Sequence, residues 1–165
     1  MKKSLLPLIL VFIFAACSPV NNQDNRQNNI NINMAQTFMD DLFVRADLEA
    51  VKAAMHSEFT FTYMGNIENV GGIDHGIESF FGNHVPVVGE LLPDGIVLTT
   101  VDVIADDDGV ALIMIGDAEG INGEYDNKYV FTFKMKEGLI REIKEYNSDL
   151  LVATRFYKNE LAAIN

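Results

Sequence analysis

The spacing of hydrophobic residues along this chain predicts helices first and strands later. Between residues 34 and 46, apolar side chains recur at helical intervals, which indicates an amphipathic helix. Asp47 is a good N-cap for a second helix that ends near residue 55. From residue 58 to 64 an aromatic side chain occupies every second position, Phe61 among them, so we expect a strand there.

After Gly71, turn residues separate short apolar segments. Asp74 is expected to cap a short helix that ends near Gly82, and residues 85–92 fit no single element. Beyond a turn at residues 93–95 we expect a meander of strands, followed by a last helix capped by Ser148. The expected strands are residues 96–105, 110–118, 124–135 and 139–147. This order predicts one α+β domain over residues 34–165, with helices packed on one face of a curved antiparallel sheet.

The first residues carry the pattern of an export signal. Lys2 and Lys3 precede an apolar stretch over residues 5–16, which is too short to span a bilayer. The stretch ends in Phe14-Ala15-Ala16-Cys17, which resembles the lipobox of bacterial lipoproteins. The resemblance implies that residues 1–16 are a cleaved signal peptide and that Cys17 carries acyl chains such as palmitate. Ser18 rather than Asp follows Cys17, so we expect an outer-membrane anchor facing the periplasm of a bacterial cell envelope.

Residues 17–33 are rich in Asn and Gln and contain few apolar side chains. Such a composition is typical of segments that build no core. We therefore expect a flexible tether between the lipid anchor and the domain.

Charge and cysteine content exclude several classes of function. The formal net charge of −12 is unsuited to holding nucleic acid phosphates, so no nucleic-acid partner is expected. One cysteine cannot form an intrachain disulfide, and His56, His75 and His84 lack the spacing of metal ligands. No metal or other cofactor is predicted.

Three segments, taken together, resemble the SnoaL-like branch of the NTF2-like superfamily, which includes the ketosteroid isomerases. They are a glycine-led short helix at residues 72–81, a strand of alternating Tyr, Asn and Phe at 125–133, and a closing hairpin with Glu145-Tyr146. The resemblance implies a cone, in which a strongly curved sheet wraps around the N-terminal helices and leaves a mostly apolar pocket at its open end. The superfamily contains enzymes and binding domains, so the fold alone does not assign a function.

Strand alternation selects the residues that we expect to line this pocket. An aromatic wall with a few polar groups suits a small, partly hydrophobic ligand. The expected lining residues are Phe61, Tyr63, Tyr125, Asn127, Tyr129, Phe131, Glu145 and Asn147.

The sequence leaves open whether the domain is an enzyme. The position of the steroid isomerases' base carboxylate matches residues 61–64, which contain no carboxylate. The epoxide hydrolases of the superfamily use two carboxylates around an arginine, and the matching positions here are Asp117, Glu145 and the apolar Ile115. Glu145 and Asp117 are therefore the candidate catalytic residues.

Three functions remain to be compared. The first is an exported, lipid-anchored domain that binds a small hydrophobic molecule, and the second is an isomerase, cyclase or hydrolase that uses Glu145 or Asp117. The third is a homodimeric interaction domain without catalysis, because NTF2-like sheets often pair through the outer face of the meander. We expect Thr132, Lys134 and Ile140 on that face.

Overall fold

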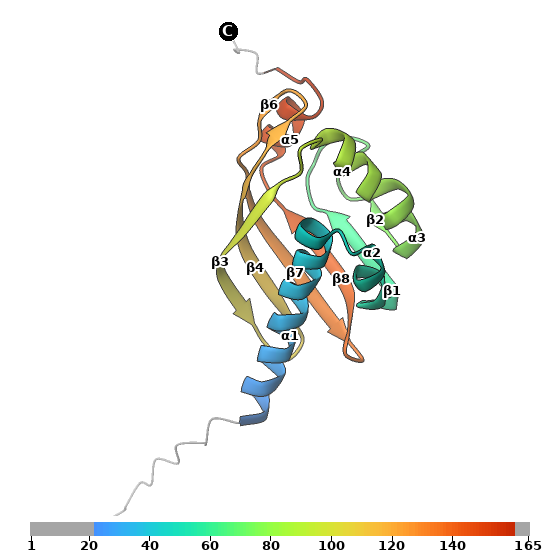
Figure 1. Ribbon diagram of the computed structural model, residues 1–165, viewed down its shortest axis with the longest axis vertical. Helices are drawn as coiled ribbons and strands as arrows, with labels where there is room; N and C mark the ends of the chain where they lie inside the picture. Colours follow the sequence, from blue (N-terminus) through green and yellow to red (C-terminus); the bar gives the residue numbers. More distant parts are fainter. Residues whose placement is uncertain (1–21, 161–165) are drawn as a thin grey trace, which may run out of the picture.

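A computed structural model describes residues 22–160 of the chain (Figure 1). Its helical elements are α1 (Asn22–Asp40), the π-helical turn η1 (Asp41–Arg45), α2 (Leu48–Ala53), α3 (Ile77–Ser79), the π-helical turn η2 (Phe80–His84), α4 (Val85–Leu91) and α5 (Asp149–Arg155). Its strands are β1 (Met55–Tyr63), β2 (Asp74–His75), β3 (Val97–Ala105), β4 (Gly109–Asp117), β5 (Glu119–Gly120), β6 (Gly123–Glu124), β7 (Lys128–Lys136) and β8 (Leu139–Tyr146).

Six strands form one curved sheet in the order β2-β1-β8-β7-β4-β3, and β5 pairs with β6 in a separate short ribbon. The segment from β3 to β8 is the predicted antiparallel meander. The sheet is nevertheless mixed, because β1 pairs with β8 in parallel. Register shifts between Thr100 and Asp102 in β3 and between Lys134 and Met135 in β7 mark irregularities of the kind that bend a sheet.

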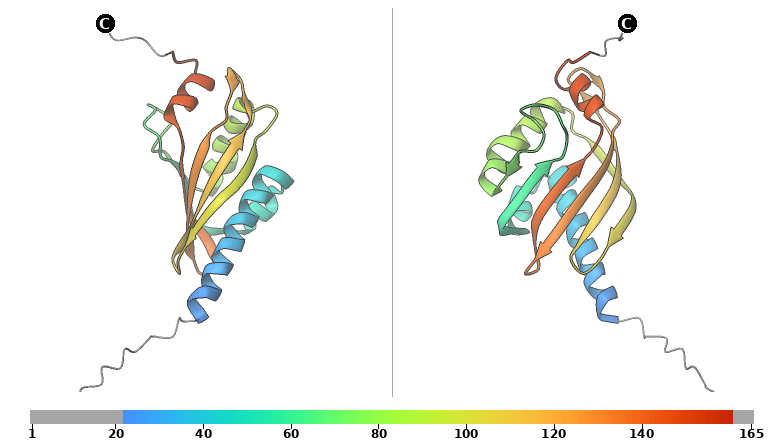
Figure 2. Two further views of the ribbon diagram at one scale, coloured as in Figure 1. Left: turned by 90° about the vertical axis from the view of Figure 1, so that its left-hand side faces the viewer. Right: turned by 180° about the vertical axis from the view of Figure 1, so that it is seen from behind.

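Helix α1 crosses the concave face of the sheet, and the helical segment 77–91 lies on the same side of the sheet (Figures 1 and 2). The inward side chains of the strands pack against α1, as in the edge-to-face contact of Phe38 with Phe133, whose ring centroids are 6.2 Å apart. Viewed from behind in Figure 2, no helix among the described residues covers the outer face of β7, β4 and β3. The domain therefore encloses its core on one side of the sheet.

Helix α1 begins twelve positions before the expected helix start at residue 34, at Asn22. The side chain of Asn31 is buried, and its Nδ2 donates to the backbone oxygens of Asp106 and Asp107 at 3.2 and 3.3 Å. The prediction of a flexible tether is therefore wrong for residues 22–33, which belong to a helix that Asn31 ties to the turn after β3. The predicted signal peptide and Cys17 lie outside the described residues, and no helix within residues 22–160 is long and apolar enough to cross a membrane.

Two further expectations need correction. Asp74 does not cap a helix; it lies in β2, where its Oδ1 accepts a 2.6 Å hydrogen bond from Thr62 Oγ1. The helix instead begins at Ile77 and continues through η2 and α4, which shows that the ambiguous residues 85–91 are helical.

Ile140 is fully buried, so it does not lie on the outer face of the sheet. The predicted cap of the last helix is confirmed, because Ser148 Oγ accepts from the backbone N–H of Leu151.

Candidate functional site

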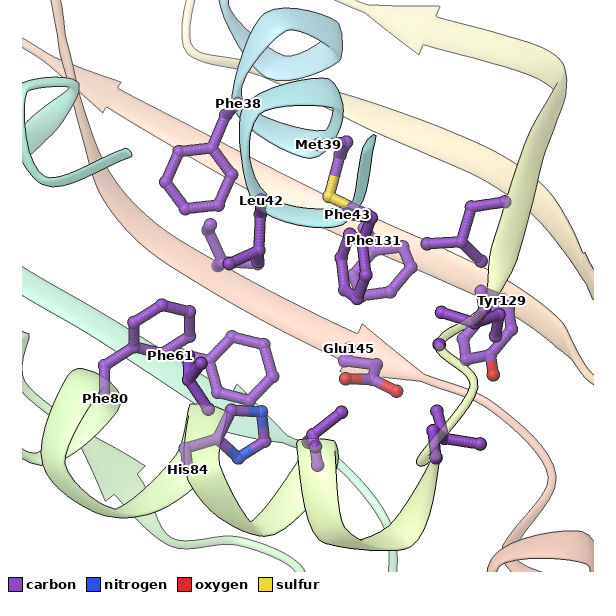
Figure 3. A pocket seen from close by; sticks show the side chains of 18 of the residues that line it. Phe38, Met39, Leu42, Phe43, Phe61, Phe80, His84, Tyr129, Phe131 and Glu145 are labelled. Carbon is purple, nitrogen blue, oxygen red and sulfur yellow. The ribbon is translucent and has the colours of Figure 1, made fainter. Parts of the chain in front are cut away.

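A cavity of about 260 Å³ lies between the concave face of the sheet, the end of α1 with η1, and the helical segment 77–91 (Figure 3). Most of the side chains around it are apolar or aromatic. They include Phe38, Met39, Leu42, Phe43, Phe61, Phe80, Val88, Phe131 and Ile143. A space of this size, lined in this way, fits a small molecule with a substantial apolar part.

A second hollow of about 210 Å³ adjoins the first towards the end of the cone that α5 covers. Its lining is more polar and includes Tyr63, Asn69, His75 and Asn147. The two hollows share five lining residues, namely His84, Val88, Tyr125, Glu145 and Phe156. Glu145 therefore stands at the boundary between an apolar compartment and a polar one.

Glu145 lies on β8, where its neighbours across the sheet are Tyr63 of β1 and Phe131 of β7. Figure 3 shows its carboxyl group pointing into the cavity. The accessible surface of the Glu145 side chain therefore faces the hollows and not the outside of the domain. Desolvation raises the pKa of Glu145 to about 7, and a 2.7 Å hydrogen bond from Asn147 Nδ2 to Glu145 Oε1 opposes that rise. Among residues 22–160, no other carboxylate and no Lys or Arg lines either hollow.

Tyrosine hydroxyls are further polar groups of the site. Tyr125 is buried, and its hydroxyl accepts from Asn127 Nδ2 at 3.1 Å and from Asn147 Nδ2 at 3.5 Å. Desolvation raises the pKa of Tyr125 to about 12 and also raises the pKa of Tyr129, so both hydroxyls are neutral at pH 7. These groups can donate or accept hydrogen bonds but cannot act as bases near neutral pH.

Tyr63 connects the second hollow to α5. Its hydroxyl donates to Asp149 Oδ1 at 2.6 Å, and the backbone N–H of Asn66 donates to the other oxygen of the same carboxylate at 3.0 Å. The hydrogen bond from Tyr63, followed by that from Asn66, lowers the pKa of Asp149. Burial and then the same hydrogen bond raise the pKa of the Tyr63 hydroxyl. This pair holds the end of β1 against the start of the last helix.

His84 is a lining residue that the sequence analysis did not select. It ends the π-helical turn η2, and its ring centroid lies 4.2 Å from that of Phe61. Desolvation, followed by repulsion from His75, lowers the pKa of His84 to about 4, so its imidazole is neutral at pH 7. A π-helical turn changes which side chains face inward, and helical spacing in the sequence gives no signal for it.

The structure brings together most of the predicted lining residues. Phe61, Tyr129 and Phe131 line the larger cavity, Tyr63 and Asn147 line the second hollow, and Tyr125 and Glu145 line both. Asn127 is buried and bonds to Tyr125 without lining either hollow.

Asp117 lies outside this group and is exposed at the end of β4. The inward positions of that strand are Val110, Leu112, Met114 and Gly116, so Asp117 points away from the cavity. Asp117 is therefore not a candidate for chemistry in this cavity. The described residues also contain no group of three or more His, Cys, Asp or Glu side chains that could hold a metal ion.

The sheet order, the covering helices and the cavity define the NTF2-like fold, as comparison with solved structures shows. Bal32a, from a soil-derived mobile gene cassette, is 20% identical, covers 79% of this chain and 98% of its own, and superposes with a TM-score of 0.67. An NTF2-like protein of unknown function from Burkholderia pseudomallei is 17% identical, with a TM-score of 0.66 and coverage of 77% and 97%.

A putative SnoaL-like polyketide cyclase from Jannaschia sp. CCS1 is also 17% identical, with a TM-score of 0.63 and coverage of 87% and 97%. No family model matches the chain, and no curated protein matches it significantly. At these identities the likeness establishes the fold and leaves the ligand and the activity to be argued from the cavity.

Proposed function

We propose that this chain binds a small, partly hydrophobic molecule in the two hollows of its cone. The observation that carries the proposal is a single carboxyl group, Glu145, at the boundary between an apolar and a more polar compartment. The aromatic walls favour burial of the apolar part of a ligand, and Glu145 fixes the orientation of one polar group.

A larger side chain at a position that lines both hollows tests this proposal. Val88 lines both hollows, whereas Val44 is 77% exposed and lines neither. Native mass spectrometry of the purified protein is expected to show a bound small molecule in the wild type and in Val44→Phe. The same molecule should be absent from Val88→Phe, provided that circular dichroism shows the same fold for both variants. Equal loading of the two variants would contradict a ligand site in the hollows.

A second candidate is acid–base catalysis, and the raised pKa of Glu145 is the observation that favours it. A carboxyl group with a pKa of about 7 is balanced between accepting and donating a proton at neutral pH. An isomerase or cyclase of this kind would use Glu145 to remove a proton from a bound substrate, and the neutral tyrosine hydroxyls would stabilise the developing oxyanion. Turnover should then disappear in Glu145→Gln while ligand binding persists.

We also propose that the domain is exported and anchored by lipid on Cys17, in the bacterial cell envelope. The proposal rests on the apolar segment and on Phe14-Ala15-Ala16-Cys17. Cells labelled with radioactive palmitate are expected to incorporate label into the wild type and into Ser18→Ala, and not into Cys17→Ser. Label retained in Cys17→Ser would contradict the anchor.

A further inference from the structure

The polar groups at the boundary of the two hollows have an excess of hydrogen-bond acceptors. Within the described residues, Glu145 accepts one side-chain hydrogen bond, which comes from Asn147 Nδ2. The Oδ1 atom of Asn147 is buried and has no hydrogen-bond partner. Turning the amide around would place its oxygen against the carboxylate, so the observed orientation is the favourable one for an ionised Glu145. A ligand with several donors would satisfy both residues.

The protein supplies no positive charge to this carboxylate. The cationic side chains of the described residues are absent from both linings, and the pKa of His84 is lowered to about 4, so its ring is neutral near pH 7. A carboxylate that lacks a positively charged partner in an apolar space is unfavourable, and a bound cation would relieve that cost. The formal net charge of −12 also favours cations over anions in the approach to the site.

Aromatic rings complete an environment suited to a cation. Tyr125, Tyr129, Phe131 and Phe156 line the same cavity as Glu145, and the rings of Tyr129 and Phe131 are stacked with centroids 5.4 Å apart. The faces of aromatic rings attract ammonium groups, and they also bury hydrocarbon. Figure 3 shows the Glu145 carboxyl group between Phe131, Tyr129 and the helix that carries His84.

We infer that the ligand is a small amine, with an apolar or aromatic body in the larger cavity and a protonated amino group against the Glu145 carboxylate, next to Asn147. The inference rests on the proposed binding function and narrows it to one chemical class. An ammonium group carries the donors that Glu145 and Asn147 Oδ1 lack, together with the countercharge. A carboxylate ligand would meet Glu145 with the same charge, and an alcohol would bring a single donor and no charge.

Isothermal titration calorimetry with three probes of similar shape tests the inference. They are 2-phenylethylamine, 2-phenylethanol and phenylacetate. At pH 8 the amine should bind at least about tenfold more tightly than the alcohol, and phenylacetate more weakly than either. Glu145→Gln should remove the preference for the amine, so that the ratio of amine affinity to alcohol affinity falls to about one. Because the variant keeps most of the negative charge of the protein, nonspecific attraction of the amine would persist in it.

A pH series provides a second readout. Affinity for the amine should fall as the pH drops from 8 to 5.5, because protonation removes the charge of Glu145, whose pKa is about 7. The other titratable groups around it are His84 of η2, His75 of β2, Tyr63 of β1, Tyr125 before β7, Tyr129 of β7 and Tyr157 beyond α5. The same pH series on Glu145→Gln, which keeps His75, isolates the contribution of Glu145. His84 and the tyrosines stay neutral over most of this range because the pKa of His84 is about 4 and those of the tyrosines are raised.

The outcomes separate the amine inference from the binding proposal. Equal affinity for amine and alcohol, or an amine affinity that does not change with pH or with Glu145→Gln, would overturn the inference while the binding proposal stands. Binding of none of the three probes would also overturn it. The search for a bound small molecule by native mass spectrometry would still decide the binding proposal independently.

Discussion

At the scale of single residues, the side chains around the hollows are held by a few short hydrogen bonds. The bond from the Tyr63 hydroxyl to Asp149 joins β1 to the last helix. It is charge-assisted, since the carboxylate is ionised and its pKa is lowered chiefly by this bond.

Removing that hydroxyl tests its contribution. We expect Tyr63→Phe to lower the free energy of unfolding at pH 7 by about 1 kcal/mol and to raise the pKa of Asp149 towards its ordinary value. Denaturant titration and carboxyl-carbon NMR measure the two effects. Tyr146→Phe is the control because Tyr146 is exposed. Unchanged stability together with an unchanged pKa of Asp149 would show that the bond contributes nothing.

Residue-level prediction succeeded where a strand has one buried face. Alternation of aromatic and polar side chains placed Tyr125, Tyr129 and Phe131 inward, and the structure confirms all three as buried. The same rule could not place Asp117, because residues 110–115 are apolar at both phases of the strand. Only the structure shows that Leu112 and Met114 face inward and that Asp117 has the opposite phase. The inward position of His84 could not be predicted from the sequence, because the π-helical turn that positions it leaves no periodic signal.

At the scale of elements, α1 shows how tertiary contacts override composition. Asn has low intrinsic helix propensity, which is why an Asn-rich segment predicts a flexible chain. The buried face of the helix nevertheless includes Asn31, Ala35, Phe38 and Met39 at helical spacing. Counting Asn31 as an inward position would have extended the predicted helix by one turn towards the N-terminus.

The contact between α1 and the turn after β3 can be tested directly. Asn31→Ala removes two hydrogen bonds from a buried side chain to backbone oxygens and should lower the free energy of unfolding by about 1–2 kcal/mol. The exposed Asn29 provides the matched control, and Asn29→Ala should change stability little. Denaturant titration measures both variants. Equal stability of the two would mean that Asn31 does not hold α1 to the β3–β4 turn.

At the scale of the whole molecule, Glu145 links the cavity to stability. In the folded chain its pKa is about 7, against an ordinary value of 4.5. Between these two pH values the folded state holds a proton that the unfolded state has lost, so the free energy of unfolding falls as the pH rises. His84, with its pKa lowered to about 4, contributes a slope of the opposite sign below pH 6.5.

Glu145→Gln separates the two slopes because His84 is the same in both proteins. The stability of this variant relative to wild type should increase as the pH rises from 4.5 to 7, by up to ~3 kcal/mol. Urea denaturation at several pH values measures the difference. A stability difference that is constant across this range would contradict a raised pKa for Glu145.

The outer face of the sheet supports a proposal of self-association. Val97, Ile104 and Ile115 are 67%, 65% and 44% exposed on neighbouring strands β3 and β4. We propose a homodimer through this face, where burial of these side chains would stabilise the pair. Sedimentation velocity at micromolar concentration should show a dimer for the wild type and for Val44→Lys, and a monomer for Ile104→Lys combined with Ile115→Lys. A monomeric wild type would contradict the dimer.

The central claim is that Glu145 is a carboxyl group held in an enclosed, mostly apolar space that receives a ligand. Carbon-13 NMR of the ligand-free protein, with labelled Glu side chains and Glu145→Gln for assignment, measures its titration directly. We expect Glu145 to titrate at a pKa of about 7. Titration near 4.5, as for a carboxyl group in water, would contradict the enclosed site and the proposals built on it.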